Sequence, residues 1–483
     1  METQSTAVLY ESVAQDISTL INSGTLGPGD RVPSVRHLSR QRRVSISTVL
    51  QAYAVLENRG LIEARPQSGY YVRAPQRPIG EPATSRPPRA PRLVGVQELV
   101  GRVLEASRQP HVVPLGGAIP GAEFVPTAKL QRIVSSVWRR NPEAMATYGM
   151  PPGREELRRQ IALRARDWGV TVTPDEVIVT NGCMEALNLC LRAVARPGDA
   201  IALESPTYFG VLQIIESLGM KAFEIPTHPR DGVSLEALEL ALEREKVKAC
   251  LLMPNVSNPL GSTMPDAAKK RLVQTLAERE VPLIEDGVYN ALHFAAAPPY
   301  AAKAYDRKGM VMLCSSFTKS LAPGFRVGWI AAGRYYEPVR ILKFMSSDSM
   351  PELLQLAVAE FLENGGYERH LRSMQRNYAR QIALAQAAVA KHFPQGTRVT
   401  RPSGGFVVWV ELPKGCDAVE LYEQALREGI GFAPGPMFSA TARYHNCLRL
   451  SCAVSWTPRI EGAIARLGEL ARGLARPAGR GHA

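Results

Sequence analysis

The first 74 residues place apolar side chains at the spacing of an amphipathic helix. In the stretch TAVLYESVAQDISTLINSG these side chains share one predicted helical face, and they are Leu9, Val13, Ile17, Leu20 and Ile21. Gly24 ends this helix, because glycine favours the backbone conformation that closes a helix at its C-terminus. The pattern therefore predicts a helix whose apolar face packs on a neighbouring element.

Two further helices and a hairpin follow in the same segment. The turn residues GPGDRVPS precede the helix SVRHLSRQRR, which Ser34 caps. The next helix, SISTVLQAYAVLENRG, ends at Gly60 and turns Val49, Tyr53 and Leu56 inward. The stretch LIEARPQSGYYVR predicts two short strands around a turn. This order of elements predicts a winged helix-turn-helix that binds DNA, and the alternative is a solvated helical hairpin used for protein contacts.

Residues 75–96, PQRPIGEPATSRPPRAPRLVGV, show no apolar periodicity. Prolines, arginines and small residues dominate, which is typical of a partly extended, semi-rigid linker that spans up to roughly 70 Å. The linker divides the chain into a small domain at 1–74 and a large domain at 97–475. We expect a small lobe of the large domain at about 371–472.

The large domain alternates apolar strands with amphipathic helices. Five strands end in polar motifs, in the stretches DEVIVTNGCMEAL, AIALESPTYFG, KACLLMPNVSNPLG, VPLIEDGVYNAL and MVMLCSSFTKS. Helical patterns such as LEALELALEREK lie between several of them. This alternation predicts an α/β fold with a mainly parallel sheet covered by helices on both faces. Because ligands bind outside the carboxyl ends of such strands, the five motifs predict one site.

Composition changes this picture in a few respects only. The chain has 483 residues with 45% hydrophobic and 21% charged side chains, which is typical of a soluble protein with more than one domain. The seven cysteines form no CxxC pair, so we expect reduced core residues and no metal site. No apolar run approaches the length of a membrane span, and we expect a cytoplasmic protein. The net charge of +13 permits nucleic-acid binding without establishing it.

The candidate chemistry begins with SSFTKSLAPGFRVGW, residues 315–329. Lys319 follows a predicted buried strand, and Arg326 comes seven residues later beside two glycines. The amine of Lys319 can form a Schiff base with an aldehyde, and the planar guanidinium of Arg326 can hold a phosphate. A lone lysine in this position is more often a surface charge, so the interpretation depends on its neighbours.

Residues at the other strand ends supply groups for the same ligand. The helix start at Gly182 offers free amides to a phosphate. Asp286 can pair with a cationic ring nitrogen, Tyr208 can stack on the ring, and Asn258 and Tyr289 can bond a ring oxygen. Each residue alone more often caps a turn or fills a core. Their order at consecutive strand ends favours one ligand with an aldehyde, a phosphate, a basic ring nitrogen and a ring hydroxyl, which is pyridoxal phosphate.

Residues 97 to about 472 resemble a fold-type I aminotransferase of the aspartate aminotransferase superfamily. The matching stretches are YGMPPG, TNGCMEAL, ESPTYFG, NVSNPLG, EDGVYNAL, SSFTKSLAPGFRVGW and CLRLSCA. The resemblance implies that Lys319 is the catalytic lysine that binds the cofactor covalently and that Asp286 is the partner of the pyridinium nitrogen. It also implies that Asn258 and Tyr289 bind the ring oxygen and that Tyr208 stacks on the ring.

The same resemblance implies the remaining ligands of the cofactor and the substrate. The phosphate-binding residues that it implies are Ser316, Arg326, Gly182 and the amides of Cys183 and Met184. Tyr148 matches a tyrosine that reaches the phosphate bound to the neighbouring subunit, which implies a homodimer. Arg449 matches the arginine that binds a substrate α-carboxylate.

The stretch GDRVPSVRHLSRQRRVSISTVLQAYAVLENRGLIEARPQSGYYV resembles the DNA-binding module of the GntR family of bacterial regulators. The candidate DNA contacts are Arg36, Arg42 and Arg43 toward phosphates, and Ser45, Ser47 and Thr48 toward base edges and phosphates. The family often has arginine at the position of Ile46. At this position an apolar contact between Ile46 and the methyl group of a thymine would replace the base contact of an arginine.

Together the two halves resemble MocR-type regulators, which join a GntR-like DNA-binding domain to an aminotransferase-like domain. The resemblance implies a transcriptional regulator that senses pyridoxal phosphate, or an amino compound through an external aldimine. The alternative is an active aminotransferase for an amino acid with an appended DNA-binding domain. A third hypothesis, an inactive body used only for dimerisation, is disfavoured by the complete set of cofactor residues. The sequence leaves open the effector, the operator, activation or repression, and whether transamination is completed.

Overall fold

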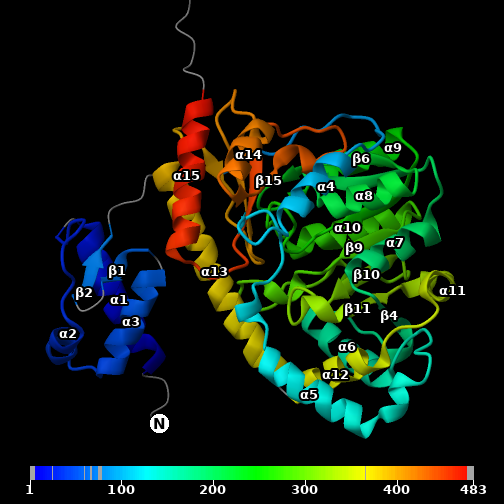
Figure 1. Cartoon of the computed structure of the whole chain (residues 1–483), viewed down its shortest axis with the longest axis horizontal. Coiled ribbons are helices and arrows are strands. Elements are labelled where there is room, and N and C mark those ends of the chain that lie inside the picture. The colour runs from blue at the N-terminus through cyan, green and yellow to red at the C-terminus, as the bar shows by residue number, and fades with distance from the viewer. Residues whose placement is uncertain are drawn as a thin grey trace, which may run out of the picture. The chain divides into compact units, whose positions relative to one another are not determined.

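The structure is a computed structural model that describes residues 6–23, 25–58, 60–65, 68–73, 79–364 and 366–475. The chain divides into two compact units, Met1–Pro78 and Ile79–Ala483 (Figure 1). Each unit has its own hydrophobic core. The two units are therefore described one after the other.

The first unit is a winged helix-turn-helix, as predicted. It consists of three helices, α1 (Thr6–Asn22), α2 (Val35–Arg42) and α3 (Ile46–Asn58), and two strands, β1 (Ile62–Arg65) and β2 (Gly69–Val72). The strands pair antiparallel, with Ile62 opposite Val72 and Arg65 opposite Gly69. Helix α1 packs on α3, and α2 packs on α3 in turn.

The core of this unit confirms most of the predicted apolar stripes. The residues Val13, Ile17, Val49, Tyr53 and Leu56 are all buried. Leu9 and Leu20 differ from the prediction, because they are 39% and 37% exposed at the edges of the α1 stripe. The Ser34 hydroxyl accepts a hydrogen bond from the amide of His37 at 3.2 Å, which confirms it as the cap of α2. Gly24, the predicted end of α1, lies outside the described residues.

The second unit contains an eight-stranded sheet in the order β4-β11-β10-β9-β8-β5-β6-β7 (Figure 1). Its strands are β4 (Val177–Thr180), β5 (Ala200–Ser205), β6 (Lys221–His228), β7 (Gly232–Val233), β8 (Val247–Leu252), β9 (Leu283–Asp286), β10 (Val311–Ser316) and β11 (Gly328–Ala331). Strand β11 runs antiparallel to both neighbours, and β7 runs antiparallel to β6. The other neighbours pair parallel, as the alternation of strands and helices predicted.

Helices cover this sheet and extend the unit at both ends. They are α4 (Gln97–Ala106), α5 (Thr127–Arg140), α6 (Glu155–Ala165), α7 (Cys183–Val194), α8 (Phe209–Ser217), α9 (Leu235–Arg244), α10 (Asp266–Glu278), α11 (Tyr336–Ser347) and α12 (Glu352–Glu363). Every residue of the central strands β5, β9 and β10 is buried. Burial on both faces explains why these strands read as continuous apolar runs in the sequence.

A second, antiparallel sheet has the order β12-β13-β16-β15. Its strands are β12 (Arg398–Val399), β13 (Val407–Glu411), β15 (Ala433–Pro434) and β16 (Cys447–Ser451), and the helices of this region are α13 (Gly366–His392), α14 (Ala418–Arg427) and α15 (Pro458–Leu474). A short parallel pair joins β3 (Val113–Pro114) to β14 (Ile430–Gly431), which ties the start of the unit to this region. The core is continuous between the two sheets.

Most of the predicted linker lies on the second unit (Figure 1). The Gly80 carbonyl accepts a hydrogen bond from the Val399 amide at 2.9 Å. Farther along, Arg92 and Ala222 exchange two backbone hydrogen bonds of 2.8 and 2.9 Å. We call residues 79–93 the strap. The remaining linker residues before it, 75–78, lie outside the described part of the chain.

Two kinds of feature are absent from the described residues. None of their helices is long and apolar enough to cross a membrane. They also contain no group of three or more His, Cys, Asp or Glu side chains that could hold a metal ion.

Candidate functional site

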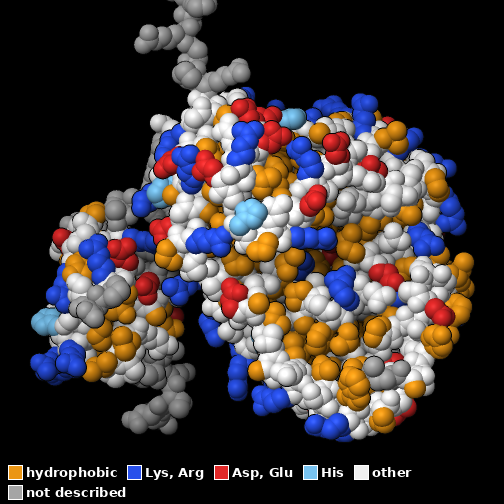
Figure 2. Space-filling view, viewed as in Figure 1, with side chains coloured by type: hydrophobic (Ala, Val, Ile, Leu, Met, Phe, Trp, Pro, Cys, Tyr) orange, Lys and Arg blue, Asp and Glu red, His pale blue; other side chains and the backbone are white. Residues whose placement is uncertain are grey.

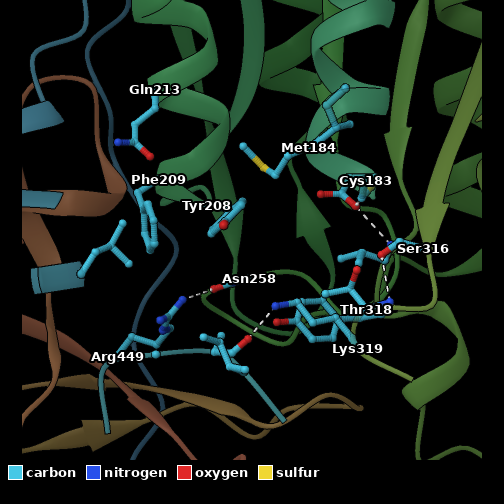
Figure 3. A pocket seen from close by; sticks show the side chains of 18 of the residues that line it. Cys183, Met184, Tyr208, Phe209, Gln213, Asn258, Ser316, Thr318, Lys319 and Arg449 are labelled. Atoms are coloured by element: carbon cyan, nitrogen blue, oxygen red, sulfur yellow. Dashed lines mark hydrogen bonds between the residues drawn. The ribbon is translucent and has the colours of Figure 1, made fainter. Parts of the chain in front are cut away.

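A cavity of about 260 Å³ lies at the carboxyl ends of the central strands (Figure 3). The predicted site residues that line it are Cys183, Met184, Tyr208, Asn258, Asp286, Tyr289, Ser316, Lys319, Arg326 and Arg449. They come from α7, from the ends of β5, β8, β9 and β10, and from β16. The parallel sheet therefore brings the polar motifs of distant sequence segments to one place.

Lys319 is partly buried and lines this cavity, and its Nζ donates a hydrogen bond to the Ala118 carbonyl at 2.6 Å. Burial lowers the pKa of Lys319 to about 8, and the nearby charge of Arg449 contributes to the same shift. A lower pKa raises the neutral fraction of the amine near pH 7, and the neutral amine is the form that attacks an aldehyde. Lys319 is thus prepared for Schiff-base chemistry.

Asp286 ends β9 and is 2% exposed. Its Oδ1 accepts a hydrogen bond from the Val288 amide at 3.1 Å and one from the Cys183 thiol at 3.4 Å. Burial raises the pKa of this carboxyl to about 6. A cationic ring nitrogen placed opposite the carboxylate would favour its charged form, so the two groups would stabilise each other.

A cradle formed by Gly182 and Arg326 lies where α7 begins. Gly182 precedes the helix with a φ of +86°, and a Cβ added there would lie 2.5 Å from Nη2 of Arg326. The same Nη2 donates a hydrogen bond to the Asn181 carbonyl at 3.0 Å, which holds the guanidinium beside the helix start. Helix amides and a guanidinium side by side are suited to an anion. Glycine at 182 permits this close approach.

Thr318 is a lining residue that the sequence did not single out. Its amide donates to the Ser316 hydroxyl at 3.4 Å, and its own hydroxyl accepts from Nη1 of Arg326 at 3.5 Å. It therefore lies at the same end of the cavity as Arg326. Its position in the serine-rich run before Lys319 is the signal that would have pointed to it.

Two tyrosines, Tyr208 and Tyr289, also line the cavity, and Figure 3 labels the first of them. Tyr208 is the cap residue of α8, and a Cβ added at Gly210 would lie 2.5 Å from its ring. Tyr289 is 2% exposed, and its hydroxyl makes no hydrogen bond within the described structure. A buried hydroxyl without a partner is costly, so a ligand oxygen at this point would stabilise the site.

Arg449 lies on β16 and is 1% exposed. Its Nη1 donates to Oδ1 of Asn258 at 3.0 Å, and its Nη2 donates to the Gly116 carbonyl (Figure 3). Its guanidinium lies 5.1 Å from the ring centre of Phe438 and 5.9 Å from that of Phe209. Nε is buried and makes no hydrogen bond within the described structure. Burial lowers the pKa of Arg449, and a bound carboxylate would supply the missing counter-charge.

Two predicted cofactor residues are not among the lining residues of this cavity: Gly182, which lies next to Arg326, and Tyr148. Tyr148 is 74% exposed and lines a separate hollow with Met350 and Leu353. The cavity is also lined by residues that the sequence did not indicate. They include Val103, Leu104, Ser107, Ile119, Gln213 and Met437.

Three of the predicted DNA contacts make polar contacts within the first unit. The Ser45 hydroxyl accepts from the Thr48 amide at 3.1 Å, so Ser45 caps α3. Thr48 is 8% exposed and its hydroxyl lies 2.7 Å from that of Ser45, which argues against a contact with DNA. Arg42 pairs with Asp16 at 2.8 Å.

The other predicted DNA contacts are exposed. Arg36, Arg43 and Ser47 all face solvent, and basic side chains gather over α2 (Figure 2). Ile46 and Leu50 on α3 are 50% and 45% exposed. Leu50 was not predicted as a contact, and its place one turn after Ile46 is the signal that would have found it.

Comparisons with known proteins agree with both halves. Residues 123–467 match the family of class I and II aminotransferases, and residues 9–72 match the bacterial regulatory proteins of the gntR family. The chain is 41% identical over 463 residues to an uncharacterised HTH-type transcriptional regulator of Escherichia coli, YjiR. The match covers 95% of this chain and 98% of that protein. It is 27% identical over 435 residues to the "Probable rhizopine catabolism regulatory protein MocR" of Rhizobium meliloti, covering 88% of this chain and 85% of that one.

The chain belongs to the MocR-type transcriptional regulators. The second unit of this regulator also resembles the solved structure of LysN, an α-aminoadipate aminotransferase of Thermus thermophilus complexed with N-(5'-phosphopyridoxyl)-L-leucine. The match has a TM-score of 0.71 and 30% identity, and it covers 79% of this chain and 99% of that structure. The fold-type I body, the GntR-type DNA-binding domain and pyridoxal phosphate as the cofactor are thereby established for the regulator.

The described residues fit this cofactor. The unpartnered Tyr289 hydroxyl provides a place for a ring oxygen, and the cradle between Gly182 and Arg326 provides one for a phosphate. Asp286 and Lys319 lie in the same cavity for the ring nitrogen and the aldehyde.

Proposed function

We propose that this regulator binds operator DNA as a homodimer and changes its DNA binding when an amino compound, or pyridoxal phosphate itself, occupies the cavity. Arg449 carries the proposal, because it is a buried cation with an unpartnered Nε in the same cavity as Lys319. A guanidinium placed in this way is suited to the carboxylate of an amino acid. A DNA-binding protein of this kind works in the bacterial cytoplasm.

Each residue has a defined role in the proposed function. When bound, pyridoxal phosphate supplies an aldehyde that condenses with amines and a ring that withdraws electrons. Lys319 holds the cofactor covalently, and Asp286 keeps its ring nitrogen protonated. Tyr208, Asn258 and Tyr289 orient the ring. The remaining roles are those of the phosphate ligands Ser316, Arg326, Gly182, Cys183 and Met184 and of the carboxylate ligand Arg449.

Exposed apolar side chains support the homodimer. Tyr148 is 74% exposed, Met150 is 48% exposed, and Met345 is 70% exposed. Apolar side chains also gather on the second unit in the part of the view where α6 and α12 lie (Figure 2). Apolar areas of this kind mark interaction sites. A second copy would cover them, and Tyr148 would then reach the neighbouring subunit's phosphate.

The alternative is an active aminotransferase with an appended DNA-binding domain. The cavity also supports this alternative, because a complete cofactor site and Arg449 would serve catalysis as well as sensing. In that case the Lys319 amine would also move a proton on the bound amino acid. The two functions differ in whether amino-acid turnover or a change in DNA binding is the main outcome.

A parallel titration tests the proposed function. A panel of amines and amino acids is added to the regulator loaded with pyridoxal phosphate, and DNA affinity, footprint and keto-acid release are measured together. We expect at least one compound to shift DNA affinity by about 1–3 kcal/mol, the usual range of allosteric coupling, with little or no turnover. Rapid turnover with unchanged DNA binding would leave the aminotransferase as the function.

Replacing Arg36 tests the proposed orientation of the DNA-binding unit. We expect Arg36→Ala to weaken binding to all sequences and to reduce the slope of log affinity against log salt by about 0.9 for each phosphate that is no longer neutralised. Fluorescence anisotropy at several salt concentrations measures both quantities. Arg372→Ala removes the same charge from exposed α13 and is the matched control. An unchanged slope for Arg36→Ala would mean that α2 does not face the DNA backbone.

A further inference from the structure

Several lining residues that have no assigned role toward the cofactor are apolar. They include Val103 and Leu104 of α4, together with Ile119 and Met437. Gln213 on α8 is a polar residue of this group, and its side chain makes no hydrogen bond within the described structure. In Figure 3 Gln213 and Lys319 lie at opposite ends of the view. An amino acid whose amine lies near Lys319 and whose carboxylate is held at Arg449 would extend its side chain toward some of these residues.

The charged side chains among the lining residues are Asp286, Lys319, Arg326 and Arg449. Under the proposed function each of them already has a role toward the cofactor or the α-carboxylate. No cationic lining residue of the described chain remains for a second carboxylate. A side-chain carboxylate placed among these apolar residues would therefore lose part of its hydration without gaining a counter-charge from this chain, which is unfavourable.

We propose that the cavity selects α-amino acids with a neutral, mainly apolar side chain, and that Gln213 contacts the far end of that side chain. This inference rests on the proposed function and adds the chemical class of the effector. Apolar lining residues favour apolar groups through burial. We expect dicarboxylic amino acids to bind at least about 30-fold more weakly than neutral ones, since an unpaired charge is costly to bury.

Binding titrations with the loaded, full-length regulator test this selectivity. L-leucine, L-methionine, L-glutamate and L-2-aminoadipate are each titrated, and the visible absorption of the bound cofactor and the melting temperature are recorded. We expect both readouts to rank the two neutral amino acids first. Tighter binding of L-glutamate or L-2-aminoadipate would overturn the inference while leaving the sensing function intact. A failure of every amine and amino acid to bind would overturn both.

A charge placed at Gln213 gives a sharper test. We expect Gln213→Arg to raise the affinity for L-glutamate by at least about tenfold, because it supplies the missing counter-charge. Gln109→Arg adds the same charge at an exposed position just after α4, outside this cavity, and is the matched control. Equal affinities of the two variants for L-glutamate would remove the role assigned to Gln213.

A second, independent observation concerns the strap. The Ser85 amide donates to the Thr227 carbonyl at 3.2 Å, and the Thr227 amide donates to the Ser85 hydroxyl at 2.8 Å. The Thr227 hydroxyl in turn accepts from the Ser205 amide at 3.0 Å. Ser205 begins the segment 205–208, which ends at Tyr208 in the cavity. Three hydrogen bonds thus join the strap to the segment that carries Tyr208.

The same buried group of side chains reaches the residues around Arg449. The Ser205 hydroxyl lies 2.9 Å from Oε1 of Glu224 and 2.6 Å from the hydroxyl of Tyr444. The Phe438 carbonyl accepts from the Thr207 amide at 3.0 Å, and the Phe438 ring packs on the guanidinium of Arg449. Contacts therefore connect both the segment of Tyr208 and the surroundings of Arg449 to Ser85.

We infer that the strap transmits the occupancy of the cavity toward the DNA-binding domain, with Ser85 as the positioning residue at its contact with Thr227. The strap directly follows residues 74–78 in the chain, so a shift of the strap acts on the segment that leads to that domain. This route requires no contact beyond those within the second unit. This inference rests on the proposed function, in which a ligand occupies the cavity. It adds the path by which that occupancy affects DNA binding.

Hydrogen exchange and DNA titration test the strap together. In the wild-type regulator we expect pyridoxal phosphate, or L-leucine added to the loaded protein, to change amide exchange in residues 79–93. In Ser85→Ala we expect cofactor and L-leucine affinities to stay within about twofold. The ligand-induced change in DNA affinity, about 5- to 150-fold for ordinary allosteric coupling, should fall to less than about twofold.

Thr84→Ala is the matched control, because it removes the exposed neighbouring hydroxyl and leaves Ser85 in place. We expect this variant to respond as the wild type does. A full DNA response in Ser85→Ala, or unchanged exchange in the wild-type strap while DNA affinity does respond, would overturn the strap inference alone. A wild type whose DNA affinity responds to no ligand would overturn the proposed function with it.

Discussion

Lys319→Ala abolishes the covalent attachment of pyridoxal phosphate and is expected to have the largest effect on the regulator. Lys319 lies in the cavity with a pKa of about 8, so its amine is the group best prepared for the aldehyde. Without it, we expect Arg326, Ser316 and the start of α7 to hold the phosphate, so that some cofactor stays bound. We expect cofactor affinity to fall by at least about 1.4 kcal/mol, or tenfold.

Borohydride reduction followed by peptide mapping measures this result. In the wild type the label should lie on Lys319, and in Lys319→Ala no peptide should carry it. Lys319→Arg keeps the positive charge but has no primary amine, so it should lose the label as well. Lys248→Ala replaces an exposed lysine of β8 and should keep the label. A label on any other lysine in the wild type would refute the assignment.

Arg449→Ala is expected to remove the preference of the cavity for carboxylates. Arg449 is buried, and its Nε makes no hydrogen bond within the described structure. A bound carboxylate would therefore pair with Arg449 in the wild type and would lose this partner in Arg449→Ala. Truncating one partner of a buried, hydrogen-bonded charge pair costs about 2–5 kcal/mol, which corresponds to a loss of roughly 30-fold to several thousandfold in affinity.

A pair of ligands isolates this effect from general damage to the cavity. L-leucine and 3-methylbutylamine differ only in the carboxylate, so the ratio of their affinities reports the contact with Arg449. We expect the wild type to prefer L-leucine and Arg449→Ala to bind the two about equally. The DNA response to L-leucine should disappear in the variant, while its covalent label on Lys319 remains. An unchanged affinity ratio would show that the carboxylate binds elsewhere.

The variant also removes hydrogen bonds from its neighbours. Asn258 Oδ1 and the Gly116 carbonyl are both left without the donor that Arg449 supplies. Arg449→Lys retains a cation without the planar fork, so it should recover part of the preference for L-leucine. A melting temperature measured for each variant separates loss of binding from loss of fold.

The sequence by itself determined the local elements and the composition of the cofactor site. The predicted helices at the start of the chain and the alternation of strands and helices depend on apolar periodicity and turn residues, which act over a few positions. The cofactor residues were predictable for a related reason. Most of them lie at or just after the end of a strand, and a parallel sheet brings the carboxyl ends of its strands to one edge whatever their separation in the chain.

Only the tertiary structure decided which other side chains complete that cavity and what surrounds it. Val103 and Gln213 lie on ordinary amphipathic helices, and nothing local shows which of their neighbours faces a ligand. The strap lies on the second unit, although its proline-rich sequence is equally typical of a linker that contacts neither domain. Thr48 is buried by contacts within its own unit, although its sequence position predicts a contact with DNA. These features depend on packing between segments distant in the chain, and apolar periodicity carries no information about the partner in such a contact.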